Sequence, residues 1–162
     1  MLTVDPARPL VIASDHGGLQ LKQHLCARLR EWGIPVLDLG TQESRSVDYP
    51  DYAVAVAEAL LGDRASAGIL VCGTGIGMSI AANRIPGIRA ALCTSGYTAR
   101  MARAHNHANV LCLGERVTGP GEAEDILRAF LEQDEEGGRH SQRLAKLESS
   151  AAALLPRGQK RP

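Results

Sequence analysis

A cysteine opens a glycine-rich stretch that reads Cys72-Gly73-Thr74-Gly75-Ile76-Gly77. Glycines at alternate positions allow a tight turn and can direct several backbone N–H groups at one point. The stretch follows an apolar run and precedes a helical pattern, so a helix N-terminus adds partial positive charge at the same place. These features predict a site that holds a phosphate or stabilises an oxyanion, with the thiolate of Cys72 beside it.

Three known classes of glycine loop are excluded by the residues of this stretch. A Walker loop requires Gly-Lys-Ser/Thr, and no lysine is present here. A dinucleotide-binding loop has Gly-x-Gly-x-x-Gly after the first strand, whereas this chain has Gly-x-Gly-x-Gly after its third predicted strand. A cysteine phosphatase closes its loop with an arginine, where this chain has Met78.

Short apolar runs alternate with amphipathic stretches from one end of the chain to the other. The runs are nearly continuous, which predicts strands buried on both faces, over residues 10–13, 35–39, 68–72, 88–93 and 109–113. Helices are predicted over residues 21–32, 50–61, 76–84, 96–105, 119–133 and 138–155. The alternation predicts βαβ units and a parallel sheet with helices on both faces. Ligands bind at the carboxyl ends of such strands, so we expect polar segments 14–18, 41–50 and 114–116 to meet the cysteine loop.

Length and charge limit the classes of function. A chain of 162 residues favours one domain, which we assign to residues 1–150, with the end of the last helix and a tail over 151–162. Its 18 basic and 18 acidic residues give no net charge, which argues against a nucleic-acid partner. The apolar runs are too short to span a membrane, and the N-terminus lacks the apolar core of a signal peptide, so we expect a cytoplasmic protein. Cys26, Cys93 and Cys112 lie in apolar contexts and are expected to be buried thiols.

Six blocks of the sequence resemble, in order, the pattern of the ribose-5-phosphate isomerase type B family. The longest runs from Cys72 to Asn83, and together they span about residues 9–150. The other five are Asp15-His16-Gly17-Gly18, Asp48-Tyr49-Pro50, His105-Asn106, Gly114-Glu115-Arg116, and Gly138-Arg139-His140 with Arg143. The resemblance implies a single-domain, three-layer α/β/α sandwich with a five-stranded parallel sheet, which is Rossmann-like. It also implies a homodimer or homotetramer that needs neither metal nor cofactor.

By the same resemblance, the protein is an aldose–ketose isomerase that interconverts ribose 5-phosphate and ribulose 5-phosphate through a cis-enediolate. One branch of the family uses a cysteine at the end of the third strand as the base, and the other uses a glutamate six residues later. This chain has Cys72 and Met78 at these positions, which resembles the cysteine branch. Cys72 is then the base, and the enediolate oxygen is expected over the N–H groups of Gly73, Gly75, Ile76 and Gly77.

The resemblance assigns the remaining catalytic and sugar-binding roles residue by residue. His105 opens the sugar ring with help from Asp15, because imidazole exchanges protons near neutral pH. Without the family, the simpler interpretation of His105 is a cation at the end of a helix. Thr74 positions the base or a substrate hydroxyl, and the contacts to sugar hydroxyls are assigned to Asp48, Tyr49 and Asn106.

Arginines are expected to hold the phosphate, because their guanidinium groups bind its oxygens in pairs. Arg116 follows the fifth predicted strand and can reach the site from the same chain. Arg139 and Arg143 lie one turn apart on the last helix, which in the family serves the neighbouring subunit's site. His16 and His140 are expected as accessory ligands.

Two alternatives remain open at this point. A non-catalytic sugar-phosphate-binding protein would use the same loop and arginines but would not need Cys72, Asp15 and His105 together. An isomerase of another aldose phosphate, with four or six carbons, such as allose or galactose 6-phosphate, differs only in substrate length. We expect segment 41–46 and the last helix to set that length. The run His105-Asn106-His107 lacks adjacent carboxylate ligands, so no metal site is predicted there.

Overall fold

The computed structural model describes residues 7–154 and contains a five-stranded, all-parallel sheet. The three central strands are fully buried: β1 (Leu10–Ser14), β3 (Ala67–Cys72) and β5 (Val110–Gly114). The edge strands are β2 (Val36–Asp38) and β4 (Ala90–Leu92), and the order across the sheet is β2-β1-β3-β5-β4. This arrangement confirms the predicted five-stranded parallel sheet.

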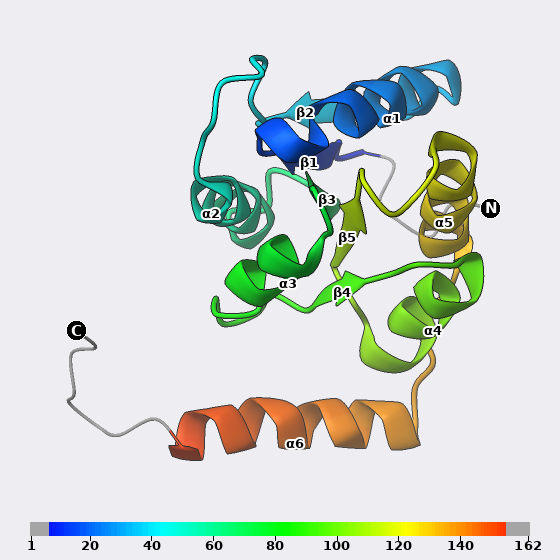
Figure 1. The fold of residues 1–162 in the computed structure, drawn as a ribbon. Helices are drawn as coiled ribbons and strands as arrows, with labels where there is room; N and C mark the ends of the chain where they lie inside the picture. The colour runs from blue at the N-terminus through cyan, green and yellow to red at the C-terminus, as the bar shows by residue number, and fades with distance from the viewer. Residues whose placement is uncertain (1–6, 155–162) are drawn as a thin grey trace.

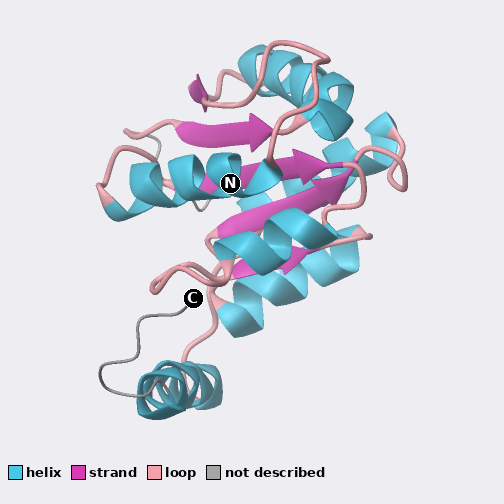
Figure 2. Ribbon diagram, turned by 60° about the vertical axis from the view of Figure 1, so that its left-hand side comes forward, coloured by secondary structure: helices cyan, strands magenta, loops and turns pink. Residues whose placement is uncertain are grey.

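Helices cover both faces of the sheet, as Figure 2 shows. On one face, a hydrophobic cluster joins the sheet to α1 (Leu19–Glu31), α4 (Gly96–Asn106) and α5 (Pro120–Glu132). On the other face, a second cluster joins it to α2 (Tyr49–Leu61) and α3 (Ile76–Ala82). The predicted three-layer α/β/α sandwich is therefore confirmed.

The last helix, α6 (Arg139–Leu154), stands off from these layers. In Figures 1 and 2 it lies beyond α4, separated from the sheet and its covering helices. Its start lies near the end of α4, and Glu148 forms an ion pair with Arg89 at 3.5 Å. The predicted end of this helix at Leu155 and the predicted tail over 156–162 lie outside the described residues.

The structure departs from the predicted elements mainly at the edges of the sheet. The strands predicted over 35–39 and 88–93 are shortened to β2 and β4, because each pairs with only one neighbour and is only partly buried. Helix α1 begins two residues earlier than predicted and follows a 3-10 turn, η1 (His16–Gly18), which was not predicted. The carboxylate of Asp15 caps this turn by accepting a hydrogen bond from the Gly17 N–H at 2.9 Å.

The order of the strands creates a crevice between β1 and β3. The connection from β1 through α1 leads outward to β2, and the next connection through α2 returns to β3 on the other side of β1. The connection that leaves the carboxyl end of β1 runs through α1 toward β2, whereas the connection that leaves the carboxyl end of β3 runs through α3 toward β4, so the two depart in opposite directions and over opposite faces. Such a reversal is where ligands bind in open α/β sheets.

Candidate active site

The cysteine loop lies at this crevice, between Cys72 at the end of β3 and Ile76 at the start of α3. Gly75 adopts a left-handed conformation with φ of 78°, which points its N–H back to the Sγ of Cys72 at 3.1 Å. The Ile76 N–H donates to the hydroxyl oxygen of Thr74 at 3.4 Å. Two of the N–H groups predicted to face an oxyanion thus point at the sulfur and hydroxyl within the loop.

Cys72 differs from the other three cysteines in its surroundings. It is buried but 6% exposed, and its Sγ accepts a backbone hydrogen bond. Burial raises the pKa of the Cys93 thiol to about 11 and raises the pKa values of Cys26 and Cys112 as well. The prediction that these three are buried thiols is confirmed.

The turn after β1 packs directly against the cysteine loop. A side chain at Gly17 would place its Cβ 3.3 Å from the Gly73 nitrogen, so the two backbones are in contact. The backbone N–H of Asp15 donates to the Val71 carbonyl at 3.3 Å, and Asp15 is buried. The turn that carries Asp15 and the loop that begins at Cys72 therefore lie next to each other at the crevice.

Arg116 and Tyr49 border the loop from two other elements. The Arg116 N–H donates to the Gly73 carbonyl at 3.0 Å, and its guanidinium carbon lies 3.3 Å from the position of a Cβ on Gly73. The ring of Tyr49, in the first turn of α2, comes within 3.0 Å of the position of a Cβ on Gly77. The absence of side chains at Gly73 and Gly77 is what admits these two neighbours.

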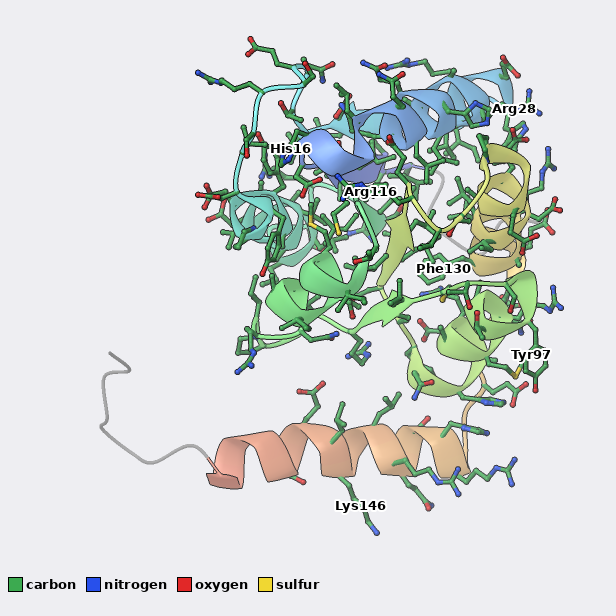
Figure 3. All side chains as sticks on the ribbon, in the orientation of Figure 1. His16, Arg28, Tyr97, Arg116, Phe130 and Lys146 are labelled. Carbon is green, nitrogen blue, oxygen red and sulfur yellow. The ribbon has the colours of Figure 1, made fainter. Side chains whose placement is uncertain are left out.

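His16 lies on the same side of the molecule as Arg116, as Figure 3 shows. Its Nδ1 accepts a hydrogen bond from the Val47 N–H at 3.2 Å, so in the neutral ring the proton is on Nε2. His16 therefore holds the end of segment 41–48 and offers an N–H donor. The following Asp48 precedes α2 and is exposed, and its side chain does not cap the helix.

The remaining predicted residues form a second group around the end of α4 and the start of α6. The rings of His105 and His140 stack with centroids 4.2 Å apart and planes 7° from parallel. Both Nε2 atoms lie 3.7 Å from the Glu136 carboxylate, and Arg139 donates to Nε2 of His140 at 3.3 Å. Burial, with the positive charges of His105, Arg139 and Arg143 opposed by Glu136, lowers the pKa of His140. Asn106, the last residue of α4, adjoins the group.

His105, Glu136 and His140 also offer three ligand atoms within 4.8 Å of one another. A metal ion lies in the plane of each imidazole that binds it, whereas these rings are stacked face to face. The lone pair of His140 Nε2 already accepts the Arg139 N–H, and two arginines repel a cation. The stacked rings and the two arginines therefore argue against a metal ion at this group.

The two groups lie at opposite ends of the strands, which form a carboxyl edge and an amino edge of the sheet. A helix that connects parallel strands runs antiparallel to them, so α4 starts at the carboxyl edge and ends, with His105, at the amino edge. The first group unites Asp15, His16, Tyr49, Cys72 and Arg116 at the carboxyl edge. The described part of one chain does not bring His105, Arg139 or His140 to Cys72.

The sequence analysis missed two residues that lie at these groups, Glu136 in the second and Glu115, which precedes Arg116, in the first. Glu136 precedes His140 by one helical turn, and this spacing was the available signal. Glu115 lies within a recognised block, but its contact with the start of α1, across 94 positions, has no local signal.

Comparison with known proteins identifies the family. The Ribose/Galactose Isomerase family matches residues 10–147. Ribose-5-phosphate isomerase B of Escherichia coli strain K12 is 47% identical over 137 residues, which cover 85% of this chain and 92% of that protein. A putative sugar phosphate isomerase of Bacillus subtilis strain 168, YwlF, is 46% identical over 139 residues, which cover 85% of this chain and 93% of that protein.

Solved structures agree with this result. The ribose-5-phosphate isomerase B of Clostridium thermocellum superposes with a TM-score of 0.88 at 48% identity, covering 91% of this chain and 99% of that one. The type B enzyme of Trypanosoma brucei gives 0.85 at 49% identity, covering 88% and 98%. Within the described residues, no helix combines the length and apolarity needed to cross a membrane. The chain belongs to the ribose/galactose isomerase family.

Proposed function

We propose that this protein interconverts ribose 5-phosphate and ribulose 5-phosphate, with Cys72 as the base. The observation that carries the proposal is Cys72 at the start of a glycine loop, against which the turn after Asp15 and the guanidinium of Arg116 both pack at Gly73. The Escherichia coli, Clostridium thermocellum and Trypanosoma brucei relatives named above as ribose-5-phosphate isomerases support the choice of substrate.

The reaction moves one proton between adjacent carbons and needs no oxidant. The Cys72 thiolate removes the proton from C2 of the open-chain aldose, and the electron pair forms the cis-enediolate. The proton of the C2 hydroxyl passes to the C1 oxygen and the thiol returns its proton to C1, which gives the ketose with its carbonyl at C2 and a hydroxyl at C1. The enediolate oxygen is stabilised by the N–H groups of Gly73 and Gly77, since those of Gly75 and Ile76 point at the sulfur and the Thr74 hydroxyl. One such donor contributes about 3–4 kcal/mol to transition states of this kind.

The second group completes the site from a neighbouring subunit. We propose a homodimer, or a homotetramer built from it, in which His105 of one chain opens the sugar ring beside Cys72 of the other. Asn106 would then contact sugar hydroxyls, and Arg139, His140 and Arg143 would join Arg116 at the phosphate. The position of His105 and Cys72 at opposite edges of one chain supports this arrangement, because one chain alone does not unite the required chemistry.

The direct test adds ribose 5-phosphate to the purified protein and measures ribulose 5-phosphate. Cys72→Ala should abolish turnover while sugar phosphate still binds, because the substitution removes the base and leaves the arginines. Cys93→Ala, which changes a buried thiol outside the loop, is the matched control and should remain active. Turnover near the wild-type rate in Cys72→Ala would refute the assignment of the base.

A second candidate is an isomerase of a six-carbon aldose phosphate, since the family description includes galactose. A turnover panel of four-, five- and six-carbon aldose phosphates separates the candidates by kcat/KM. Binding of all of them without any turnover would instead favour a sugar-phosphate-binding protein.

A further inference from the structure

Helix α1 begins beside the crevice without a capping side chain of its own. Its N-cap residue is Gly18, and the first turn contains no acidic residue. A Cβ at Gly18 would lie 2.6 Å from the carbonyl carbon and oxygen of Val71, so no larger residue fits there without displacing β3. The close packing of the β1 turn on β3 thus excludes the serine, threonine or aspartate that usually caps a helix.

Glu115 supplies this cap from the loop after β5. Its Oε2 accepts a hydrogen bond from the Leu21 N–H, in the first turn of α1, at 2.9 Å. A carboxylate at this position also interacts favourably with the positive end of the helix dipole. The cap is therefore provided by a residue 94 positions away rather than by the helix's own sequence.

The same residue is fixed to the cysteine loop through its backbone. The Glu115 N–H donates to the Cys72 carbonyl at 2.9 Å, and the next N–H, of Arg116, donates to the Gly73 carbonyl at 3.0 Å. Glu115 thus connects three parts of the site: the start of α1, the cysteine loop and Arg116. Loss of the hydrogen bond between Leu21 and the Glu115 side chain would detach the Glu115–Arg116 segment from α1, while its backbone hydrogen bonds to the cysteine loop would remain.

We propose that Glu115 is a positioning residue, which holds Arg116 against Gly73 and keeps the turn after β1 packed against the cysteine loop. It acts through its neighbours rather than on the substrate. Its carboxylate accepts the hydrogen bond from α1. The negative charge of Glu115 therefore does not neutralise the positive charge of Arg116, the next residue, which binds the phosphate. This inference rests on the proposed function, in which Arg116 binds the phosphate.

The test compares Glu115→Ala with Glu115→Gln. The alanine variant removes the acceptor of the Leu21 N–H. We expect KM for ribose 5-phosphate to rise about tenfold, because losing a hydrogen bond to a charged group weakens an equilibrium by about that factor. The value of kcat should change much less. The glutamine variant keeps an oxygen that can accept from Leu21 and should stay close to wild type. Glu122→Ala, in the exposed first turn of α5, is the matched control and should leave both constants unchanged.

An unchanged KM in Glu115→Ala, or a glutamine variant as impaired as the alanine one, would overturn the proposal. If Glu115→Ala does not fold, Glu115→Asp replaces it in the test. This variant keeps the charge but moves the carboxylate oxygen away from the Leu21 N–H, so it must show the rise in KM. Hydrogen exchange at the Leu21 amide and the Kd of inorganic phosphate do not depend on turnover. A wild-type protein without isomerase activity refutes the proposed function, whereas unchanged amide exchange and phosphate affinity in Glu115→Ala refute the positioning role.

Discussion

The hydrogen bond from Gly75 to the Cys72 sulfur depends on a backbone conformation that only glycine adopts easily. At φ of 78°, a Cβ would lie 2.5 Å from Leu92 Cδ1 and 3.0 Å from the carbonyl carbon of Leu113. Gly75→Ala should therefore move the N–H away from the sulfur and lower kcat by about 10- to 100-fold, because a hydrogen bond to a charged group contributes about 1.5–3 kcal/mol. Unfolding in urea should show a loss of about 1–3 kcal/mol from backbone strain.

Gly121→Ala is the control for this substitution. Gly121 lies in the first turn of α5, and a Cβ there meets no atom within 4 Å. Alanine at this helical position should leave kcat unchanged and stability unchanged or slightly higher. A Gly75→Ala protein with wild-type kcat would show that the N–H does not contribute to the reaction.

Individual residues were predictable where their setting is local. The place of Cys72 at the end of a buried strand, before glycines and a helix, follows from the order of residue types along the chain. The stacking of His105 on His140 was not predictable, because it depends on the path of the linker between α5 and α6. That path is fixed by contacts such as the Glu136 N–H to the Ala104 carbonyl at 2.9 Å, between residues far apart in sequence.

At the scale of elements, a buried ion pair connects α1 to the edge strand β2 and to the segment that leads to Asp48. Lys22 is fully buried, and its Nζ donates to both carboxylate oxygens of Asp38, at 2.9 and 2.6 Å. Asp38 also accepts from the Gly40 N–H at 2.9 Å. The pair thus anchors the start of segment 39–48, whose other end is held by His16.

Lys22→Met should destabilise the fold in a pH-dependent way. Burial alone would raise the pKa of Asp38, but hydrogen bonds from Lys22, Gln42 and the Gly40 N–H outweigh it and lower the pKa. Because the folded pKa is depressed, the pair stabilises the fold above the unfolded pKa of about 4, and this contribution is lost as pH falls through the folded value. The variant should lose on the order of 3 kcal/mol near neutral pH, since breaking such a pair leaves an unpaired charge.

Urea unfolding of both proteins from neutral to acidic pH measures this effect. The difference between Lys22→Met and wild type should shrink as the pH falls below about 4. Asp63→Asn, which removes an exposed ion pair with Arg8, is the control and should show a small difference at every pH. A Lys22→Met difference that does not change with pH would contradict the electrostatic origin of the effect.

The predicted bounds of the strands were more accurate where the strands are more deeply buried. The central strands β1, β3 and β5 were located within a residue or so, because continuous apolar runs mark strands covered on both faces. Strands β2 and β4 were predicted too long, since their ends lack a second neighbour. The 3-10 turn at His16 was missed because it depends on the contact of Gly18 with Val71, which the local sequence does not reveal.

At the scale of the whole molecule, the alternation of strands and helices predicted the sheet, but not its order. The order β2-β1-β3-β5-β4 places the reversal between β1 and β3, and the Asp15 turn and the Cys72 loop flank it. The same topology sends α4 back across the sheet, so that His105 reaches the opposite edge. The resemblance assigned the last helix to the neighbouring subunit's site but grouped His105 with Asp15, whereas the fold places His105 against His140 of that helix, at the opposite edge from Asp15 and Cys72.

This division predicts that two inactive variants will restore activity when combined. Cys72→Ala retains His105, and His105→Asn retains Cys72, so a mixed dimer has one site with both defects and one intact site if the sites are shared. With equal co-expression and random pairing, half of the dimers are mixed, and activity should recover to about a quarter of the wild-type value. Each variant purified alone should be inactive. Differently tagged chains isolated by two affinity steps allow the mixed dimer to be measured directly. If His105 instead served the Cys72 of its own chain, every site in the mixed dimer would carry one defect, and no activity would return.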